Sequence, residues 1–287
     1  MHSDPPVATY FFRKLRGGSQ PLLVQASDKS FYVVKTLENP QGCNLLFNES
    51  VGSELYQALA LPVPRWTPIR VTADFLDKNP GSWFQSDNGA TRPHPGVCFA
   101  SQFLDLGTRA VLDVLPESFH PRIENRWDFW LAWIVDICAD HADNRQALFT
   151  GTNGGKLATT FIDFGHMFGG AAGLDSPLPS SSRYLDWRIY PWTNVDGLGA
   201  LIDVVKNLDA DRLWLKVANL PDDWKTISAL RAFNRALHRL SSDHLMRDAV
   251  ECISGDLNSR RVQRENRKDD ALRFPHSILP PGIRAIA

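Results

Sequence analysis

Cysteine is scarce in this sequence, and its spacing argues against two kinds of site. The four cysteines are far apart and form no CxxC pair: Cys43, Cys98, Cys138 and Cys252. This spacing argues against a zinc centre, whose cysteine ligands usually come in such pairs, and against a disulfide framework. Isolated thiols of this kind are typical of proteins in a reducing compartment.

Long hydrophobic runs are also missing. The longest, near residues 128–138, is too short and too interrupted to span a bilayer. Residues 1–18 lack the uninterrupted apolar stretch of a signal peptide. We therefore expect a cytoplasmic protein that has no membrane partner.

An excess of one charge is absent as well. The 31 basic and 32 acidic residues give a formal net charge of -1, so no overall field favours binding to nucleic acid. Basic residues do concentrate in residues 259–268, SRRVQRENRK, but such a run is more often a solvated helix face than a nucleic-acid site. We expect no clear nucleic-acid binding.

The first part of the chain is rich in strand signals. With 287 residues, 43% of them hydrophobic, the chain fits one two-lobed domain or two small domains. Runs of β-branched and aromatic residues between turn residues predict strands over residues 8–15, 21–27, 30–37, 66–76 and 96–106. Helical spacing predicts a helix over residues 44–61, and the polar residues 77–95, rich in Gly and Pro, predict a loop.

From about residue 107 helical patterns dominate. They predict helices over residues 109–116, 124–140, 196–207, 209–217, 223–240 and 242–254. One hairpin interrupts them, because two strand-like runs within residues 146–164 flank the turn Asn153-Gly154-Gly155. The predicted fold class is therefore α+β, with a strand-rich N-lobe over residues 1–106, a mainly helical C-lobe over 107–265 and an irregular tail over 266–287.

Polar side chains gather in residues 138–149, CADHADNRQALF, between an apolar helix and this hairpin. Because a hairpin brings the ends of its strands together, Asp140, Asp143 and Asn144 are expected to lie close to Asp163. Carboxylate and amide oxygens are ligands that Mg²⁺ prefers, with water and phosphate filling its other positions. A single aspartate is more often a cap or a turn residue, but the group as a whole favours a metal site.

The N-terminal part supplies a second indication. Lys35 ends the apolar run FYVVK, and the next predicted helix carries Glu49 and Glu54. A strand lysine paired with a helix glutamate holds nucleotide phosphates in kinase-type folds, although an edge lysine that reaches solvent is an equally common explanation. The turn Gly17-Gly18-Ser19 can bring backbone N–H groups close to phosphate, or be an ordinary hairpin turn. The serial order of these parts is that of a protein-kinase-like fold.

Five stretches carry a resemblance to a known family: RGGSQP (16–21), YVVKTLENPQG (32–42), NESVGSEL (48–55), LALPVP (59–64) and FIDFGHMF (161–168). In these stretches the chain resembles the HipA-like kinase family, over roughly residues 8–250. The resemblance implies a two-lobed protein-kinase-like fold with ATP between the lobes. It also implies Lys35 on the phosphates, Glu49 as its helix partner with Glu54 as second choice, and Asp163 on Mg²⁺. Gln102 would begin the hinge against the adenine.

The loop at 138–149 departs from the family pattern, in which an asparagine follows the catalytic aspartate by five positions. If the strand ALF sets the register, Gln146 takes the place of the metal-binding amide and Asp143 becomes the catalytic carboxylate. If Asp140 sets it, Asp140 is the base and Asn144 the amide. We prefer Asp143 with Gln146.

Three functions fit these residues. The first is an ATP- and Mg²⁺-dependent phosphotransferase, with a protein Ser/Thr or a small molecule as acceptor. The second is a nucleotide-binding module without catalysis that acts by interaction, as the irregular loop allows. The third is a metal phosphohydrolase built on Asp140, His141, Asp163 and His166, in which Lys35 has no role.

Overall fold

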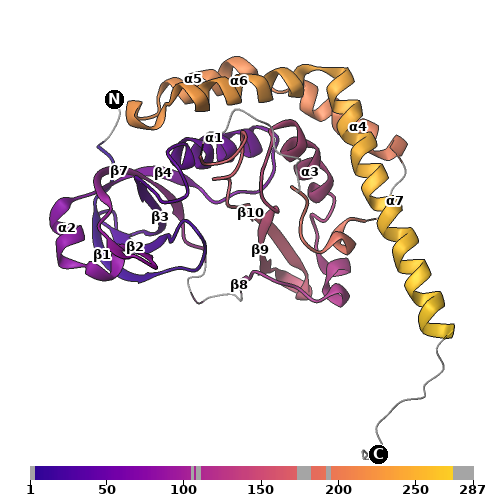
Figure 1. Ribbon diagram of the computed structural model, residues 1–287, viewed down its shortest axis with the longest axis horizontal. Coiled ribbons are helices and arrows are strands. Elements are labelled where there is room, and N and C mark those ends of the chain that lie inside the picture. Colours follow the sequence, from indigo (N-terminus) through magenta and orange to yellow (C-terminus); the bar gives the residue numbers. More distant parts are fainter. Residues whose placement is uncertain (1–3, 105–106, 108–110, 173–181, 192–194, 274–287) are drawn as a thin grey trace, which may run out of the picture.

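The computed structural model describes residues 4–104, 107, 111–172, 182–191 and 195–273. A strand-rich N-terminal part is followed by a mainly helical C-terminal part (Figure 1), which confirms the predicted α+β class. Residue 106, at which the two predicted lobes are divided, lies outside the described residues. Within them, no helix is both long enough and apolar enough to cross a membrane.

A five-stranded antiparallel sheet forms the N-terminal part, in the order β1-β2-β3-β7-β4. Its strands are β1 (Ala8–Lys14), β2 (Leu22–Ala26), β3 (Phe31–Leu37), β4 (Trp66–Val71) and β7 (His94–Gln102). The first three predicted strands are confirmed. Lys35 lies on the central strand β3, opposite Phe99 of β7.

Two predictions for the rest of this part are wrong. The second half of the predicted strand 66–76 is the short helix α2 (Ala73–Lys78), because Thr72 accepts a hydrogen bond from the Phe75 backbone N–H at 3.1 Å and caps it. The predicted loop 77–95 contains the 3₁₀ turn η1 (Pro80–Ser82) and a small hairpin, β5 (Phe84–Ser86) with β6 (Gly89–Thr91).

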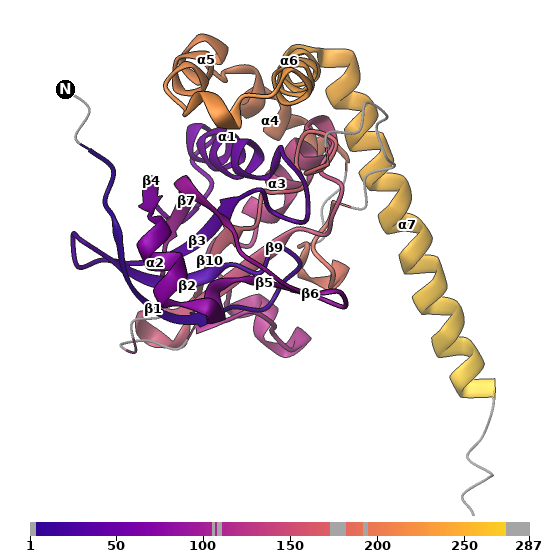
Figure 2. The same cartoon turned by 60° about the vertical axis from the view of Figure 1, so that its left-hand side comes forward.

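Helix α1 (Leu45–Ala58) lies between the sheet and the C-terminal helices (Figures 1 and 2). It contacts β3 and β7 on one side and α5 (Ala210–Ala218) on another. Because neighbours surround it, its polar residues are buried along with its apolar ones. Asn48 and Glu49 are 0% and 2% exposed. Buried polar groups need hydrogen-bond partners, so this helix carries interactions beyond packing.

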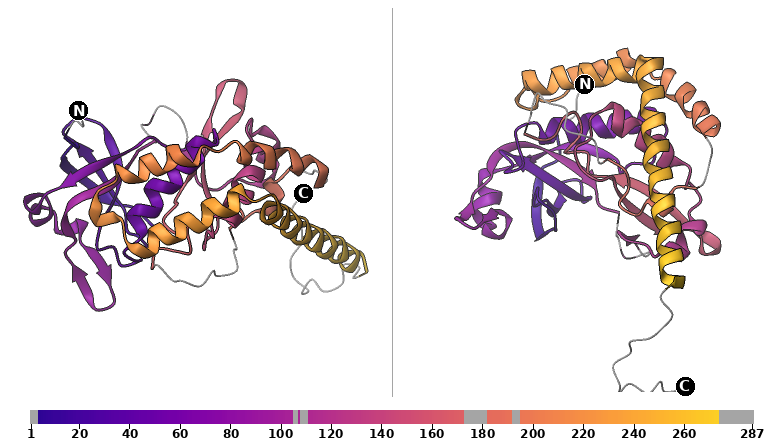
Figure 3. Two further views of the ribbon diagram at one scale, coloured as in Figure 1. Left: turned by 90° about the horizontal axis from the view of Figure 1, so that it is seen from above. Right: turned by 45° about the vertical axis from the view of Figure 1, so that its right-hand side comes forward.

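The C-terminal part is organised around helix α3 (Asp128–Cys138), whose aromatic residues Phe129 and Trp130 are fully buried. It packs against α4 (Val195–Lys206), α6 (Ile227–Ser241) and α7 (Asp243–Arg273), among others. Figure 3 shows α5 and α6 crossing over α1, and the far end of α7 extending away from the body of the molecule. Short 3₁₀ turns complete this part: η2 (Glu117–Arg122), η4 (Trp187–Ile189) and η5 (Asp222–Trp224).

Two further predictions need correction. Residues 111–112 of the predicted helix 109–116 form a short strand, β8 (Val111–Leu112), while 109–110 lie outside the described residues. β8 pairs with β9, and the hydrogen bonds of this pairing replace those that a helix would have made. The predicted irregular tail is helical up to Arg273, because α7 continues that far, and residues 274–287 lie outside the described part.

The predicted hairpin is confirmed as β9 (Gln146–Gly151) and β10 (Leu157–Ile162), joined through η3 (Asn153–Gly155). Its register pairs Gln146, the first residue of β9, with Ile162, the last of β10. The loop before β9 and Asp163 after β10 are therefore neighbours, as the sequence indicates.

Gly52 shows how closely α1 approaches the segment after β10. A Cβ atom at this position would lie 2.6 Å from Phe164 Cβ and 2.7 Å from Met167 Sδ. We expect Gly52→Ala to lower the free energy of unfolding by about 1–3 kcal/mol through overpacking. Gly255→Ala is the control, because no atom lies within 4 Å of the added methyl group. It should stabilise by roughly 0.5–1 kcal/mol through helix propensity. Urea denaturation measures both, and stabilisation by both variants would contradict the close approach.

Candidate active site

A cleft of about 500 Å³ lies between the N-terminal sheet and the β9–β10 hairpin. Most of the predicted site residues line it: Gly17, Gly18, Ser19, Lys35, Glu49, Gln102, Asp143, Gln146 and Asp163. Asp140 and Asn144 are not among the lining residues that the structure describes. Six separate segments of the chain thus bring their residues to one cavity.

Lys35 lies at the centre of this cleft and pairs with two carboxylates. Its Nζ donates a short hydrogen bond to Glu49 Oε1 and another, 2.7 Å long, to Asp163 Oδ1. The side chains of Lys35 and Glu49 are 8% and 3% exposed, whereas that of Asp163 is 29% exposed and faces the cleft. Glu54, the second choice for this role, instead accepts from Trp66 Nε1 at 3.0 Å and pairs with Lys216.

The charges of this group stabilise one another. Burial opposes the charge of Lys35, but Asp163 and Glu49 outweigh it and raise the pKa of the lysine above its ordinary value. Burial also opposes the charge of Asp163, yet Lys35 lowers the pKa of that carboxyl well below its usual range. For Glu49, burial dominates and raises the pKa. Asp163 is therefore ionised at neutral pH and available as a cation ligand.

Gln146 lies beside Asp163 because of the hairpin register. Its Nε2 donates to Asp163 Oδ2 at 2.8 Å. The described residues contain no group of three or more His, Cys, Asp or Glu side chains placed to hold a metal ion. A carboxylate and an amide oxygen fit Mg²⁺ only where phosphate and water oxygens supply its remaining positions. The donor set therefore fits a metal ion shared with a nucleotide, with the Gln146 amide turned to present its oxygen.

The two candidate catalytic aspartates have different surroundings. The Asp140 carboxylate forms an ion pair with Arg239 of α6, and its residue has a left-handed backbone with φ 48°. Asp143 lines the cleft, and its Oδ1 accepts a 2.7 Å hydrogen bond from the backbone N–H of Asn144. The register set by the strand ALF thus places Asp143 and Gln146 at the cavity, and that pair is the one we favour.

Asn48 fixes the segment that follows Asp163. Its Nδ2 donates to the carbonyl oxygens of Gly165 at 2.9 Å and Met167 at 2.7 Å. Asp163 itself has a left-handed backbone with φ 63°, and a Cβ at Gly165 would collide with Leu45 and Glu49 of α1. A side chain there would displace Leu45 or Glu49, so α1 positions both Glu49 and the turn that presents Asp163.

Arg145 is a residue of this site that sequence reasoning missed. It is fully buried, and its guanidinium donates two hydrogen bonds to the Asp136 carboxylate, at 2.8 and 2.7 Å. Its Nη1 donates to the backbone oxygens of Ile162 at 3.0 Å and Asp163 at 3.1 Å. The signal in the sequence is Asp136, a carboxylate inside the otherwise apolar run 129–138, which needs a buried partner.

Aromatic side chains complete the surroundings of this ion pair. The Tyr56 hydroxyl of α1 donates to Asp136 Oδ1 at 2.7 Å. The guanidinium of Arg145 lies over the rings of Tyr56 and Phe164, 4.9 and 4.7 Å from their centroids. One buried cation therefore joins α1, α3, the loop before β9 and the end of β10.

Two histidines hold the loop by hydrogen bonds. His141 is buried, and its Nδ1–H donates to the carbonyl oxygen of Asp143 at 2.6 Å. Burial, followed by the nearby Arg145 charge, lowers the pKa of His141 to about 4. His166 Nε2 lies 3.1 Å from Gln41 Nε2. The Gln41 side chain also lies against the glycine turn, because a Cβ atom added to Gly18 would contact it.

Comparison with known proteins supports the fold. No protein-family model matches the chain, and no curated protein matches it. Among solved structures, the Helicobacter pylori proinflammatory kinase CtkA has a TM-score of 0.55 and 13% identity, over 85% of this chain and 98% of that one. The Golgi casein kinase has a TM-score of 0.54 and 12% identity, over 86% of this chain and 74% of that one. Its structure with Mn/ADP bound matches with a TM-score of 0.54 and 12% identity, over 86% and 73%.

Identities this low establish the fold alone. The chain has a protein-kinase-like fold, with a strand-rich N-terminal part and a helical C-terminal part, as the sequence predicts. The specific resemblance to HipA-like kinases stays a prediction, since no family model matches.

The Asp136–Arg145 pair gives a direct test of the buried network. Asp136→Asn keeps the shape of the side chain but leaves the Arg145 charge without its counter-ion. We expect a loss of about 3–5 kcal/mol in the free energy of unfolding. Asp74→Asn breaks the exposed pair with Lys78 instead, and should change stability by roughly 0.5 kcal/mol or less. Chemical denaturation compares the two, and equal effects would show that the buried pair has no special weight.

His141 predicts a specific acid sensitivity. Below about pH 6.5 the unfolded chain protonates this residue, whereas the folded chain resists protonation until about pH 4. The unfolded state then binds more protons, so stability falls as the pH decreases through this window, by about 3 kcal/mol from this residue. The variant His141→Gln should show a flatter stability profile between these pH values. Identical slopes in denaturation experiments would contradict the assignment.

Proposed function

We propose that the chain is an ATP- and Mg²⁺-dependent phosphotransferase of the HipA-like kinase type, acting on an alcohol group. One observation carries this proposal: Lys35, at the base of the cleft, is bonded to both Glu49 and Asp163. A lysine between a helix carboxylate and a second carboxylate is suited to hold nucleotide phosphates beside a metal ion. The kinase-like fold of the chain supports the same conclusion.

In this proposal the N-lobe, residues 1–106, binds the nucleotide. Lys35 contacts the α- and β-phosphates, and Glu49 orients Lys35. Backbone N–H groups of the turn Gly17-Gly18-Ser19 face the phosphates across the cleft. The adenine lies against the segment that begins at Gln102, which lines the same cavity.

The C-lobe, residues 107–265, carries the reacting groups in this proposal. Asp163 and Gln146 hold Mg²⁺, which neutralises phosphate charge when bound. Asp143 accepts the proton of the acceptor hydroxyl and orients its oxygen toward the transferred phosphoryl group. Asp140 with Asn144 is the alternative pair, and the ion pair of Asp140 with Arg239 favours the first assignment. Catalysis then consists of positioning and charge neutralisation.

The acceptor we propose first is a protein Ser/Thr, with a small molecule as the alternative. A cytoplasmic location is part of the proposal and rests on the four isolated cysteines. Two of them, Cys98 and Cys138, are buried free thiols.

A second function is favoured by one contact. Gln146 presents its nitrogen to Asp163, and a glutamine extends one methylene further than the asparagine usual at this place. If the amide oxygen does not reach Mg²⁺, the chain is a nucleotide-binding interaction module without catalysis.

Nucleotide binding tests what the two functions share. With ATP and Mg²⁺ at 100 times Kd, the native state should gain about 2.7 kcal/mol and melt at a higher temperature. Lys35→Ala should lose this ligand-induced shift, and so should Asp163→Ala, each compared with its own ligand-free melting curve. Asp143→Ala should keep it, because that residue serves the acceptor. A wild type without any shift would contradict both functions.

Phosphoryl transfer separates the two functions. We expect the wild type to release ADP from ATP in the presence of Mg²⁺, slowly with water or its own hydroxyl groups as acceptor. Asp143→Asn should reduce the rate by roughly 10²–10⁴-fold while leaving nucleotide affinity unchanged. Asp140→Asn is the matched control and should keep most of the rate. Binding without measurable transfer in the wild type would establish the silent module.

A further inference from the structure

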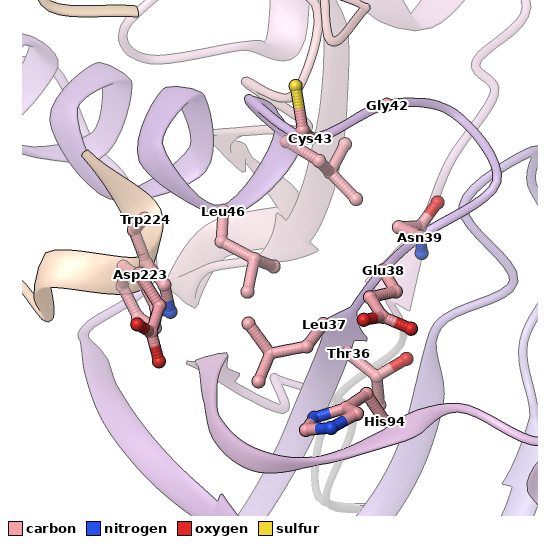
Figure 4. A pocket seen from close by; sticks show the side chains of 11 residues that line it. Thr36, Leu37, Glu38, Asn39, Gly42, Cys43, Leu46, His94, Asp223 and Trp224 are labelled. Atoms are coloured by element: carbon pink, nitrogen blue, oxygen red, sulfur yellow. The ribbon is translucent and has the colours of Figure 1, made fainter. Parts of the chain in front are cut away.

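A second cavity, of about 370 Å³, lies outside the candidate active site (Figure 4). It is formed by the end of β3, the start of α1, the first residue of β7 and the turn η5. None of its lining residues lines the nucleotide cleft. The cavity is therefore a separate site, although it is built on the same strand and helix as the Lys35–Glu49 pair.

The lining has a definite chemical character. Apolar side chains of Leu37, Leu46 and Trp224 form one side (Figure 4). Two carboxylates, Glu38 and Asp223, also line it together with His94, and none of the described lining residues is a lysine or an arginine. Within the described residues, neither carboxylate has an ion pair or a hydrogen bond. An apolar surface with uncompensated negative charge is complementary to a cation on an apolar stem.

A hydroxyl that opens onto the same cavity also points to a ligand. Thr36 is 3% exposed and lines the cavity. Its hydroxyl has no hydrogen-bond partner among the residues that the structure describes. The oxygen itself is open to the cavity, where it can accept a hydrogen bond from an N–H group brought by a ligand. The indole N–H of Trp224 cannot serve, since it donates to the Val97 carbonyl oxygen at 3.1 Å.

We propose that this cavity binds an organic cation, a guanidinium or primary ammonium group on an aliphatic stem. Glu38 and Asp223 supply the complementary negative charge from two sides of the cavity, Thr36 accepts one N–H hydrogen bond of the charged group, and the stem packs on Leu37 and Leu46. A free amine and a basic side chain of a polypeptide share this chemistry.

The cavity is coupled to the candidate active site by direct contacts, a step that rests on the proposed function. Thr36 and Leu37 follow Lys35 on β3, and Leu45 lies one helical turn before Glu49. A Cβ at Gly165 would contact both Leu45 and Glu49. A ligand that holds β3 against the start of α1 therefore favours the arrangement in which Lys35 and Glu49 are paired. By linkage, nucleotide and cation raise each other's affinity by the same factor.

Cys43 allows binding to be measured at the cavity itself. Its thiol is exposed and lines the cavity, whereas Cys252 is exposed on α7 and serves as an internal reference. Agmatine is the first probe, because its four-carbon stem carries a guanidinium at one end and a primary ammonium at the other. At ten times its Kd it should slow alkylation of Cys43 by iodoacetamide about tenfold, by mass action, and leave Cys252 unchanged. Equal rates at Cys43 up to agmatine concentrations of tens of millimolar would overturn the proposal.

Charge-neutral variants identify the groups that bind. The double variant Glu38→Gln with Asp223→Asn should weaken agmatine binding roughly tenfold, since each exposed carboxylate contributes a few-fold. Asp222→Asn is the matched control, because Asp222 is adjacent but pairs with Lys225. The same affinity in the double variant and the control would overturn the assignment. The peptide acetyl-Leu-Arg-Leu-amide distinguishes the two sources of the cation. If it binds more tightly than agmatine, the ligand is a side chain of a polypeptide. If it binds more weakly, the ligand is a free amine.

The coupling has its own readout. Saturating agmatine should raise the affinity for ADP about fivefold in the wild type, and the double variant should lose this effect. Cation binding with unchanged ADP affinity would overturn the coupling. Absence of any ADP binding would overturn the proposed function, while the protection of Cys43 would still decide whether the cavity is a cation site.

Discussion

The buried ion pair between Arg145 and Asp136 is the constraint on which the candidate site depends. Arg145 is the last residue of the loop before β9, yet its guanidinium points into the core and fixes the backbone at the end of β10. Burying an ion pair costs free energy unless its hydrogen-bond donors all have acceptors. Most of the donors of Arg145 have one. Such a network holds one loop geometry, with Asp143 and Gln146 left facing the cleft.

Helix α1 is the second organising element. It supplies Glu49 to Lys35, Asn48 to the backbone after Asp163, and Tyr56 to the Arg145–Asp136 pair. Its position thus decides whether the parts of the cleft are assembled together. The second cavity lies at the start of this same helix, and its lining residues Thr36 and Leu45 are close in the chain to Lys35 and Glu49.

Local patterns in the sequence predict much of this arrangement. A Gly-Gly turn between β-type runs determines the hairpin, and the hairpin alone brings Gln146 to Asp163. What the sequence could not show depends on distant partners. In the sequence Arg145 looks like an ordinary polar loop residue, and only the fold shows that it pairs with Asp136. The segment RAVLDVLP has helical spacing, but pairing of Val111–Leu112 with β9 overrides that propensity. The run VTADFL alternates like a strand, yet the Thr72 cap starts a helix there.

A crystal structure with Mg²⁺ and a non-hydrolysable ATP analogue tests the central claim most directly. We expect the phosphates within hydrogen-bond distance of Lys35 Nζ, with the Lys35–Glu49 pair intact. The metal should contact Asp163 and the amide oxygen of Gln146, so that Lys35 gives up its direct bond to Asp163. A nucleotide bound away from Lys35, with the Lys35–Asp163 bond unchanged, would contradict the assignment of this cleft as a phosphotransferase site.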